Sequence, residues 1–445
     1  MIIKINKNNH FLFYSLLSVL IVLLFARYAF LINIPRIVLT VIVFAIAICG
    51  NKNEVIAIAM CCLPLHNAIN LYMAISVCAF MYVIKENKRI KLGAIAAVIV
   101  SMILWEILHC FDSNFSLKLL FVTISPMLLL MVVSGSDMRS LDYSFIVRTM
   151  AIVNIIVCVV LFLNLLVSAN YSFADALISI RRLGIVTEDS AVFGATINPN
   201  ALGIINILTM IALLQLRSSG QGSALDFCFT LILLVFGFLT ASRTFLVCLC
   251  VMAILLFLAQ RGSAQKKLQF VVAFTVLVIL LFIVLFYLFP EQLVYYINRF
   301  KNGNVTNGRD MLMSVYHNYI VHNNRVLFFG IGLNDFETKV TRIYNISNAV
   351  PHNFIQEIVL AWGIVGVILV VCLNITMVIR SINCNKKQSL LNFIPLLIIL
   401  LKSMAGQFLT SGYTMLALSF AYLSLCQNFD RSDMHLEENP DKVSK

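Results

Sequence analysis

Residues 353–377 read NFIQEIVLAWGIVGVILVVCLNITM, a run whose polar side chains gather at the start and whose remainder is mostly apolar. A helix that crosses the hydrocarbon core of a bilayer needs about 20 mainly apolar residues, so this run is long enough to span a membrane. The whole chain is 61% hydrophobic and only 12% charged, with a mean hydropathy of +0.96. A soluble domain cannot bury that much apolar surface, so the sequence predicts an all-α integral membrane protein.

Similar apolar runs recur along the chain and predict a polytopic helical bundle of about 12 to 14 transmembrane helices. The expected spans cover residues 11–32, 35–50, 68–84, 91–110, 116–134, 146–168, 200–216, 227–241, 244–260, 268–289, 353–377, 389–407 and 411–427. The run 54–64 is shorter and ends at a proline, so it is either a brief crossing or a re-entrant piece. Gly363 and Gly366 lie inside one span, where small residues let another helix or a lipid chain approach closely.

Basic residues fall in the short connections between these spans, where an excess of lysine and arginine marks the cytoplasmic side. They are Lys4, Lys7, Lys85, Lys88, Arg89, Lys91, Arg261, Lys266, Lys267, Arg380, Lys386 and Lys387. Counting crossings from them places both termini in the cytoplasm. The same count places the loop 169–199, the turn at Ser242–Arg243 and the loop 290–352 on the outer side. This assignment requires the segment 54–84 to make an even number of crossings.

The predicted topology divides the chain into five regions. They are N-terminal transmembrane helices at 1–169, central transmembrane helices at 170–289 with an outer loop at 170–199, one large extracytoplasmic loop at 290–352, C-terminal transmembrane helices at 353–427 and a cytoplasmic tail at 428–445. The tail is polar and of mixed charge, which is typical of disorder.

Composition and spacing exclude several classes of function. The net charge of +12 is spread over the connections between spans, so nucleic acid is not an expected partner. Most of the twelve cysteines lie within or beside apolar runs, which is not the pattern of a disulfide framework or a zinc ribbon. The outer loops hold no DxD motif, no histidine-rich cluster and no carboxylate pair like that of a glycosidase. We therefore expect neither a metal nor a cofactor.

Arginines on the expected outer side are the first candidates for chemistry. Arg243 lies between two apolar spans with almost no loop to hold it in water, and charges at such boundaries are usually functional. Arg309 follows Gly308 at the opening of a predicted helix, where the helix dipole favours an anion and a guanidinium suits a phosphate. Arg181 and Arg182 precede the sequence FGATINPNALG at the entrance to the next span.

Polar residues at the start of the quoted span form the second group. Pro351 is a good first helical residue, so His352 is expected in the first turn at the outer boundary. Gln356 follows His352 by one helical turn. Glu357 follows Asn353 in the same way, which predicts a polar collar that faces a cavity rather than lipid. Several arginines and one histidine on the same side predict a site that holds a diphosphate and moves a proton.

Four stretches of the chain carry a family resemblance through their order and spacing. They are INPNALG at a span entrance, SRTFLVCLCVMAILLF, the loop sequence GRDMLMSVYHNYIVHNNRVLFFGIGLNDF, and PHNFIQEIVLAWGIVG at the end of that loop. Together they resemble the O-antigen ligase and O-antigen polymerase superfamily of bacterial envelope polysaccharide assembly. The resemblance covers roughly residues 180–380. It implies a GT-C-like fold and a metal-independent, inverting glycosyltransferase that uses glycan carried on undecaprenyl diphosphate.

The resemblance also implies roles for particular residues. Arg243 and Arg309 match arginines that bind the diphosphate, and His352 matches the histidine that activates the acceptor or assists the transfer. Either Arg181 or Arg182 matches a further arginine ahead of the asparagine motif. The residues expected to bind substrate are Arg181, Arg182, Asn200, Asn353 and Gln356.

The expected function is polymerisation of an envelope polysaccharide such as O-antigen, capsule or exopolysaccharide. The active site would face outward from a multi-pass protein of the cytoplasmic membrane, and the bilayer would hold the undecaprenyl-diphosphate-linked oligosaccharide. A chain-length regulator and a flippase are the expected protein partners. One alternative is a ligase that passes glycan to a lipid or protein acceptor. Another is a non-enzymatic transporter of lipid-linked sugars, which unrelated halves and arginines at one face disfavour.

Overall fold

In the residues that it describes, the computed structural model has helices joined by turns and irregular segments, and no strands. Those residues are 10–86, 91–109, 117–136, 138–168, 172, 183–184, 197–259, 309–333, 340, 343–344, 351–384 and 389–427, with single positions between 265 and 298. The helices are α1 (Phe11–Tyr28), α2 (Arg36–Cys49), α3 (Lys52–Cys61), α4 (Leu71–Lys85), α5 (Ala94–His109), α6 (Leu117–Ser134), the 3-10 turn η1 (Met138–Ser140), α7 (Tyr143–Ser168), α9 (Pro199–Ser218), α10 (Ala224–Leu239), α11 (Arg243–Ala259), α14 (Arg309–Val321), α15 (Asn324–Phe329), α17 (Phe354–Cys384), α18 (Leu390–Ser403) and α19 (Gly412–Leu425). The all-α prediction is confirmed for this part of the chain.

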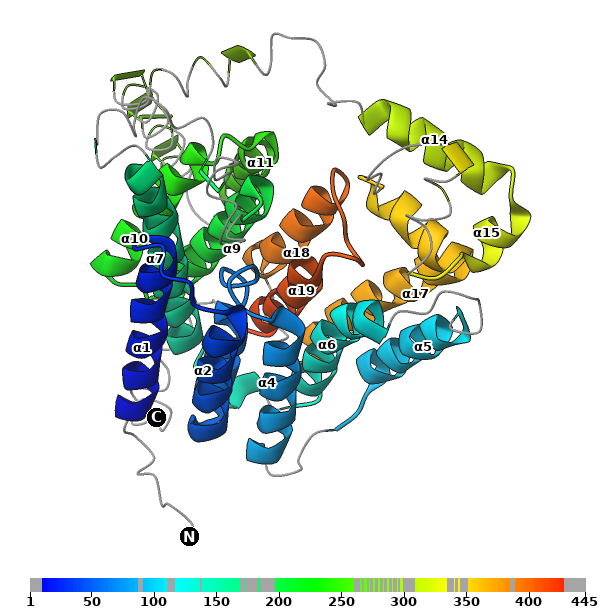
Figure 1. Cartoon of the computed structure of the whole chain (residues 1–445), viewed down its shortest axis with the longest axis horizontal. Coiled ribbons are helices and arrows are strands. Elements are labelled where there is room, and N and C mark those ends of the chain that lie inside the picture. The colour runs from blue at the N-terminus through cyan, green and yellow to red at the C-terminus, as the bar shows by residue number, and fades with distance from the viewer. Residues whose placement is uncertain are drawn as a thin grey trace, which may run out of the picture.

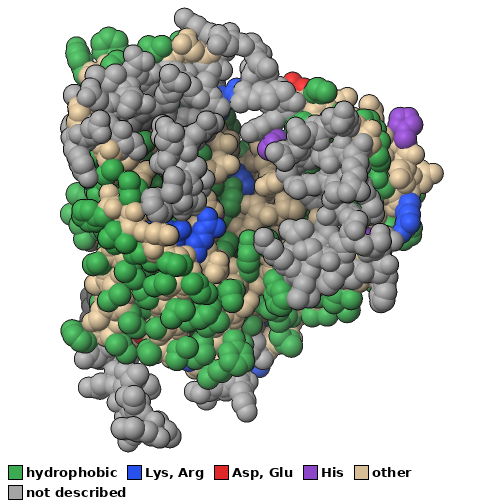
Figure 2. All heavy atoms as spheres, in the orientation of Figure 1, with side chains coloured by type: hydrophobic (Ala, Val, Ile, Leu, Met, Phe, Trp, Pro, Cys, Tyr) green, Lys and Arg blue, Asp and Glu red, His purple; other side chains and the backbone are tan. Residues whose placement is uncertain are grey.

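Apolar helices make up most of the bundle (Figure 1). Within the described residues, α1, α7, α9 and α17 are long and apolar enough to cross a membrane, and eight further apolar helices have 10–17 residues. The most apolar window of α9 is 89% buried, whereas those of α1 and α17 are 33% and 44% buried. So α9 lies inside the bundle while α1 and α17 turn apolar side chains outward, and Figure 2 shows many hydrophobic side chains on the described part of the face in view. These features favour a membrane protein, and the count of about 12 to 14 spans stays a prediction.

One end of the bundle, which we call the basic end, is identified by contacts between helix ends. Lys52 Nζ at the start of α3 lies 3.5 Å from the carboxyl group of Glu86, just after α4. The N–H of Lys91, ahead of α5, donates to the carbonyl oxygen of Gly135, just after α6, at 2.8 Å. Lys85, the last residue of α4, lies there too. The chain from α3 to α4 therefore leaves the basic end and returns to it, as the even number of crossings requires.

The turn segment 62–70 between α3 and α4 lies at the opposite end of the bundle. There the ring of His66 lies 5.1 Å from the ring of Tyr413, in the first turn of α19. With only 10 residues, α3 is about 15 Å long, and the following turns complete the passage. This arrangement favours a brief crossing over a re-entrant piece for residues 54–64.

Contacts of polar side chains show at which end of the bundle the remaining helices begin. α7 begins at the basic end, beside the start of α3. Arg148 in α7 donates to the two carboxyl oxygens of Asp226, at the start of α10, at 3.0 and 2.9 Å. Gln215, near the end of α9, accepts from the hydroxyl of Tyr143 at 2.7 Å and donates to Ser424 Oγ at 2.7 Å. As a result, the starts of α9, α11 and α17 lie with the end of α18 at the opposite end.

Candidate functional site

Arg243 is the first residue of α11 and directly follows a tight turn at the opposite end of the bundle. Ala241 in this turn has a φ of 47°, in the left-handed region. Ser242 is fully buried, and its Oγ accepts from the N–H of Phe245 at 3.2 Å, which caps the first turn of α11. The Nη1 atom of Arg243 is buried, so its side chain leans into the protein.

Asn200 lies in the first turn of α9, next to this turn. The Oδ1 of Asn198 accepts from the N–H of Asn200 at 2.9 Å, which explains why the asparagine motif begins a helix. Asn200 Oδ1 in turn accepts from Ser242 Oγ at 2.7 Å. Asn200 thus supports the turn that carries Arg243, and its binding of substrate stays a prediction.

Arg181 and Arg182, ahead of the asparagine motif, lie outside the described residues. The next residue, Leu183, is fully buried and donates its N–H to the carbonyl oxygen of Leu239 at 2.7 Å. Because Leu239 ends α10, the chain just after the two arginines lies beside the turn that carries Arg243.

The start of α17 differs from the prediction. The helix begins one residue after Asn353, whose Oδ1 accepts from the N–H groups of Ile355 at 2.9 Å and Gln356 at 3.3 Å. The prediction that Pro351 opens the helix, with His352 in its first turn, is therefore wrong. The Asn353 side chain satisfies N–H groups at the helix start, which a proline cannot do. His352 lies just ahead of this cap and is half-buried.

Gln356 joins α17 to α14. Its Nε2 donates to the carbonyl oxygen of Met313 at 2.9 Å, so the amide contacts the backbone of α14. One helical turn further along α14, the fully buried Tyr316 packs in a small apolar cluster with residues of α15 and α17. Arg309 is the first residue of α14, which confirms the predicted helix start, while its side chain lies outside the described residues. These contacts fix α14 against the part of α17 that follows His352.

Glu357, in the first turn of α17, holds the connection between α18 and α19. Its side chain is fully buried. Its carboxyl oxygens accept from the N–H of Phe408 at 2.5 Å and from both the N–H and the Oγ1 of Thr410, at 2.8 and 2.6 Å. At this position the predicted polar collar faces a protein loop instead of a cavity.

Lys402, near the end of α18, is a charged residue of this end that the sequence analysis missed. It is only 6% exposed. Its Nζ donates to the carbonyl oxygen of Gln407 at 2.8 Å and to Thr414 Oγ1 at 2.7 Å, and it lies 4.6 Å from the centre of the Tyr413 ring. The available signal was a lone lysine inside an otherwise apolar run, a position where charges are usually functional.

A second buried carboxyl group, that of Glu106 in α5, holds the segment that follows α15. It accepts from Trp362 Nε1 at 2.6 Å and from the N–H of Leu333 at 3.2 Å. Trp105 Nε1 donates to the carbonyl oxygen of Trp362 at 3.1 Å. That oxygen is released from the helix ladder because α17 breaks at Gly363, where φ is 65° and ψ is −162°.

The break at Gly363 lets another backbone approach α17 closely. The N–H groups of Ile331 and Gly332 donate to the carbonyl oxygens of Leu360 and Ala361, each at 2.8 Å. A Cβ atom on Gly363 would lie 2.3 Å from the backbone of α15. The close approach predicted at this glycine is confirmed, with the end of α15 as the neighbour.

Glu106→Gln should loosen the segment after α15. The N–H of Leu333 lies 3.2 and 3.4 Å from the two carboxyl oxygens of Glu106, and Trp362 Nε1 lies 2.6 Å from the second of them. An amide puts an NH2 donor in place of one of these acceptor oxygens, which removes at least one of the bonds at a cost of about 1–3 kcal/mol. Limited trypsin digestion at the exposed Arg325 of α15 should then be about 5- to 150-fold faster, because cleavage requires local opening. Glu54→Gln alters a buried carboxyl group at the basic end and should leave this rate unchanged. Equal digestion of both variants would contradict a local attachment.

A hollow opens at this end of the molecule. Figure 2 shows it between α9 and α11 on one side and α14 on the other, with Lys or Arg and His side chains at its walls. The described charged groups of this end include the cations Arg243 and Lys402 and the acids Glu106 and Glu357. In the part of the chain that the structure describes, no three His, Cys, Asp or Glu side chains are grouped as a metal site requires.

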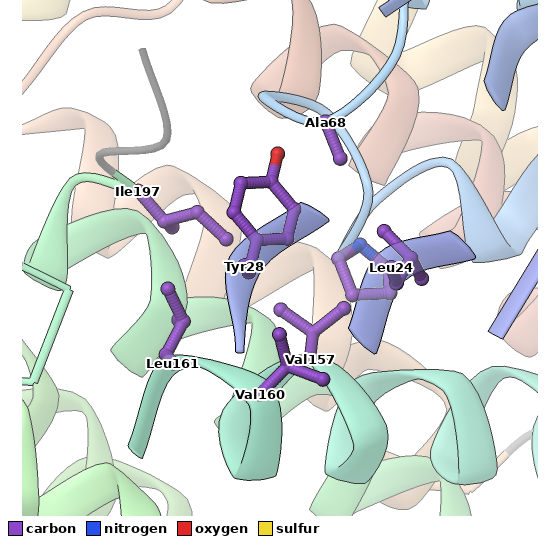
Figure 3. A pocket seen from close by; sticks show the side chains of 8 residues that line it. Leu24, Tyr28, Ala68, Val157, Val160, Leu161 and Ile197 are labelled. Atoms are coloured by element: carbon purple, nitrogen blue, oxygen red, sulfur yellow. The ribbon is translucent and has the colours of Figure 1, made fainter. Parts of the chain in front are cut away.

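An apolar pocket lies between α1, α7 and the turn segment 62–70 (Figure 3). It is lined by Leu24, Tyr28, Pro64, Ala68, Val157, Val160, Leu161 and Ile197. The lining carries no charged side chain, so this pocket suits apolar atoms and is distinct from the charged hollow.

Comparison with known protein families finds no family that matches the chain, and no curated protein matches it. The fold by itself defines a coarse class, an all-helical protein with several helices suited to a membrane.

Proposed function

We propose that this protein is a polymerase of an envelope polysaccharide, a metal-independent and inverting glycosyltransferase of the cytoplasmic membrane. The observation that carries the proposal is the shared position of Arg243, His352 and the start of α14 at one end of an apolar bundle. A transferase acting on a lipid-linked diphosphate needs cations and a base at one membrane face. The four stretches that resemble the O-antigen superfamily include all three features.

The donor is a growing glycan on undecaprenyl diphosphate, whose lipid lies in the bilayer and whose diphosphate lies at Arg243 and Arg309. The hydroxyl group of a lipid-linked repeat unit attacks the anomeric carbon, and its proton passes to His352. The bond between the anomeric carbon and the diphosphate oxygen breaks as the new glycosidic bond forms, which inverts the anomeric centre. The two arginines stabilise the charge of the departing diphosphate.

The placement of charge supports an outward-facing site. Lys52, Lys85 and Lys91 lie at the basic end, and an excess of such residues marks the cytoplasmic side. The described chain also begins and ends there, since His10 Nδ1 lies 2.7 Å from the carboxyl group of Glu54 and α19 ends near Gln215. In the proposed orientation both termini are cytoplasmic and the charged hollow faces outward.

Purified protein in lipid nanodiscs should convert lipid-linked repeat units, supplied alone and in the presence of EDTA, into a ladder of longer products. Each added unit should release one undecaprenyl diphosphate, measured by mass spectrometry. Product that appears only after a lipid core or protein acceptor is added would identify a ligase instead. Movement of the lipid-linked sugar across a vesicle membrane with no new glycosidic bond would identify a transporter.

A further inference from the structure

We propose that Glu357 is a positioning residue for His352. Together with Lys402 it fixes the connection 404–411, between α18 and α19, against the first turn of α17, and so sets where His352 stands in the site. We call this attachment of the connection 404–411 by Glu357 and Lys402 the clamp. Its role in positioning His352 rests on the proposed function, whereas the existence of the clamp does not.

One peptide group carries the clamp. The peptide bond between Gln407 and Phe408 is held at both ends, because its carbonyl oxygen accepts from Lys402 Nζ at 2.8 Å and its N–H donates to Glu357 at 2.5 Å. The ammonium group thus meets the negative end of the peptide dipole and the carboxyl group meets the positive end. Charge-assisted hydrogen bonds of this kind are stronger than neutral ones. Two buried charges from α17 and α18 therefore stabilise one orientation of the connection.

The next residues add to the same attachment. Thr410 donates to Glu357 from its N–H and its Oγ1, and the fully buried ring of Phe408 lies 6.1 Å from the ring of Phe354. Phe354 is the first residue of α17 and follows His352 by two positions. A shift of the connection therefore moves the helix start that directly follows His352.

The outer part of α17 depends on such contacts. The break at Gly363 separates residues 354–362 from the rest of the helix, so the long inner part cannot orient them rigidly. Glu357 attaches this outer part to the connection 404–411, and Glu106 attaches its far end through Trp362. Of these two attachments, that of Glu357 is nearer to His352 in the chain.

The contacts of the two charges favour positioning over direct catalysis. The carboxyl group of Glu357 already accepts three hydrogen bonds and is fully buried. Lys402 already donates two and faces the Tyr413 ring. A substrate group would have to displace these partners, so the two side chains act on the reaction through the connection that they hold.

Glu357→Gln tests the proposal because the N–H groups of Phe408 and Thr410 bind different carboxyl oxygens, and an amide keeps only one of these two acceptors. Hydrogen exchange of peptides covering 404–411 should become about tenfold faster or more. The kcat of glycan transfer should fall about 10- to 100-fold, because small misplacements of a catalytic group are that costly. The KM for the donor should stay unchanged, since Arg243 is untouched. Thr410→Val removes only one donor and should change both quantities in the same direction by a smaller factor.

The control is Glu54→Gln, which makes the same change in a buried carboxyl group at the basic end and should alter neither exchange at 404–411 nor kcat. Unchanged exchange in folded Glu357→Gln and Thr410→Val proteins overturns the clamp. Faster exchange with a wild-type kcat overturns the positioning role. A loss of kcat/KM that comes equally from a lower kcat and a higher KM for the donor overturns it as well. If the wild-type protein makes no product, the proposed function fails; if His352→Ala transfers normally, only the catalytic role of His352 fails. In both cases the positioning of a catalytic His352 fails. The exchange data then still decide whether the clamp exists.

Discussion

Arg243→Ala is expected to stop chain extension, with a fall of about 100- to 1000-fold in the rate of glycan transfer. Arg243 stands at the start of α11, after a capped turn, and its guanidinium is partly buried. Without it, the charge that develops on the departing diphosphate loses a fixed partner. Arg243→Lys should recover part of the rate, because lysine keeps the charge and loses the planar two-pronged contact. Release of undecaprenyl diphosphate in nanodiscs measures both variants.

The matched control for this prediction is Arg217→Ala. Arg217 lies near the end of α9 at the basic end, where its guanidinium is 5.0 Å from the centre of the Phe227 ring. Its removal should leave the transfer rate near that of the wild type. Normal long polysaccharide in cells that carry Arg243→Ala at a normal protein level would remove Arg243 from the site.

Much of the helical organisation could be predicted because each apolar run must satisfy its own backbone hydrogen bonds in a membrane. The span expected at 200–216 is Pro199–Ser218 in the structure, with its start set by the cap at Asn198. The helix start at Arg309 was predictable for a similar local reason, since Gly308 interrupts the chain there. Local signals of this kind act over a few residues and need no knowledge of the fold.

The start of α17 shows where local signals compete. Pro351 and Asn353 are both suited to a helix start, and only the observed side-chain bonds of Asn353 decide between them. A prediction from the sequence therefore places His352 near the right boundary but on the wrong side of it. The difference matters because His352 then belongs to the loop that approaches the site and not to the helix.

The partners of buried polar groups were beyond the sequence because they lie far away along the chain. Glu106 binds the N–H of Leu333 across 227 residues, and Glu357 binds that of Phe408 across 51. A polar side chain in an apolar run signals that some partner exists without indicating whether it is a substrate or a loop. Gln356 was assigned to substrate on this signal, and the structure shows its amide donating to the carbonyl oxygen of Met313.

The second large effect is expected for Gly363→Ala. Whether this change raises or lowers the stability of the protein decides between a continuous and a broken α17. In a continuous helix this change should stabilise the protein by about 0.5–1 kcal/mol, because glycine is a poor helix former. Here Gly363 has a φ of 65° and a ψ of −162°, a conformation that costs any other residue about 1–3 kcal/mol. The added Cβ atom would also lie 2.3 Å from the backbone at Phe328, which forces either α15 or α17 to shift. We therefore expect a loss of about 3 kcal/mol or more, measured by thermal unfolding in detergent.

The control substitution is Gly93→Ala, ahead of α5, where an added Cβ atom meets nothing within 4 Å. It should leave the unfolding temperature nearly unchanged. The stability lost in Gly363→Ala should come from the contact between α15 and α17. Gly330 lies on the other side of this contact, where an added Cβ atom would lie 2.3 Å from the carbonyl oxygen of Ala361. Gly330→Ala should therefore destabilise the protein in the same way, and the two changes together should cost less than their sum, since either one alone already separates α15 from α17. A gain in stability from Gly363→Ala would mean that α17 runs unbroken, and the outer part of α17 would then need no clamp at Glu357.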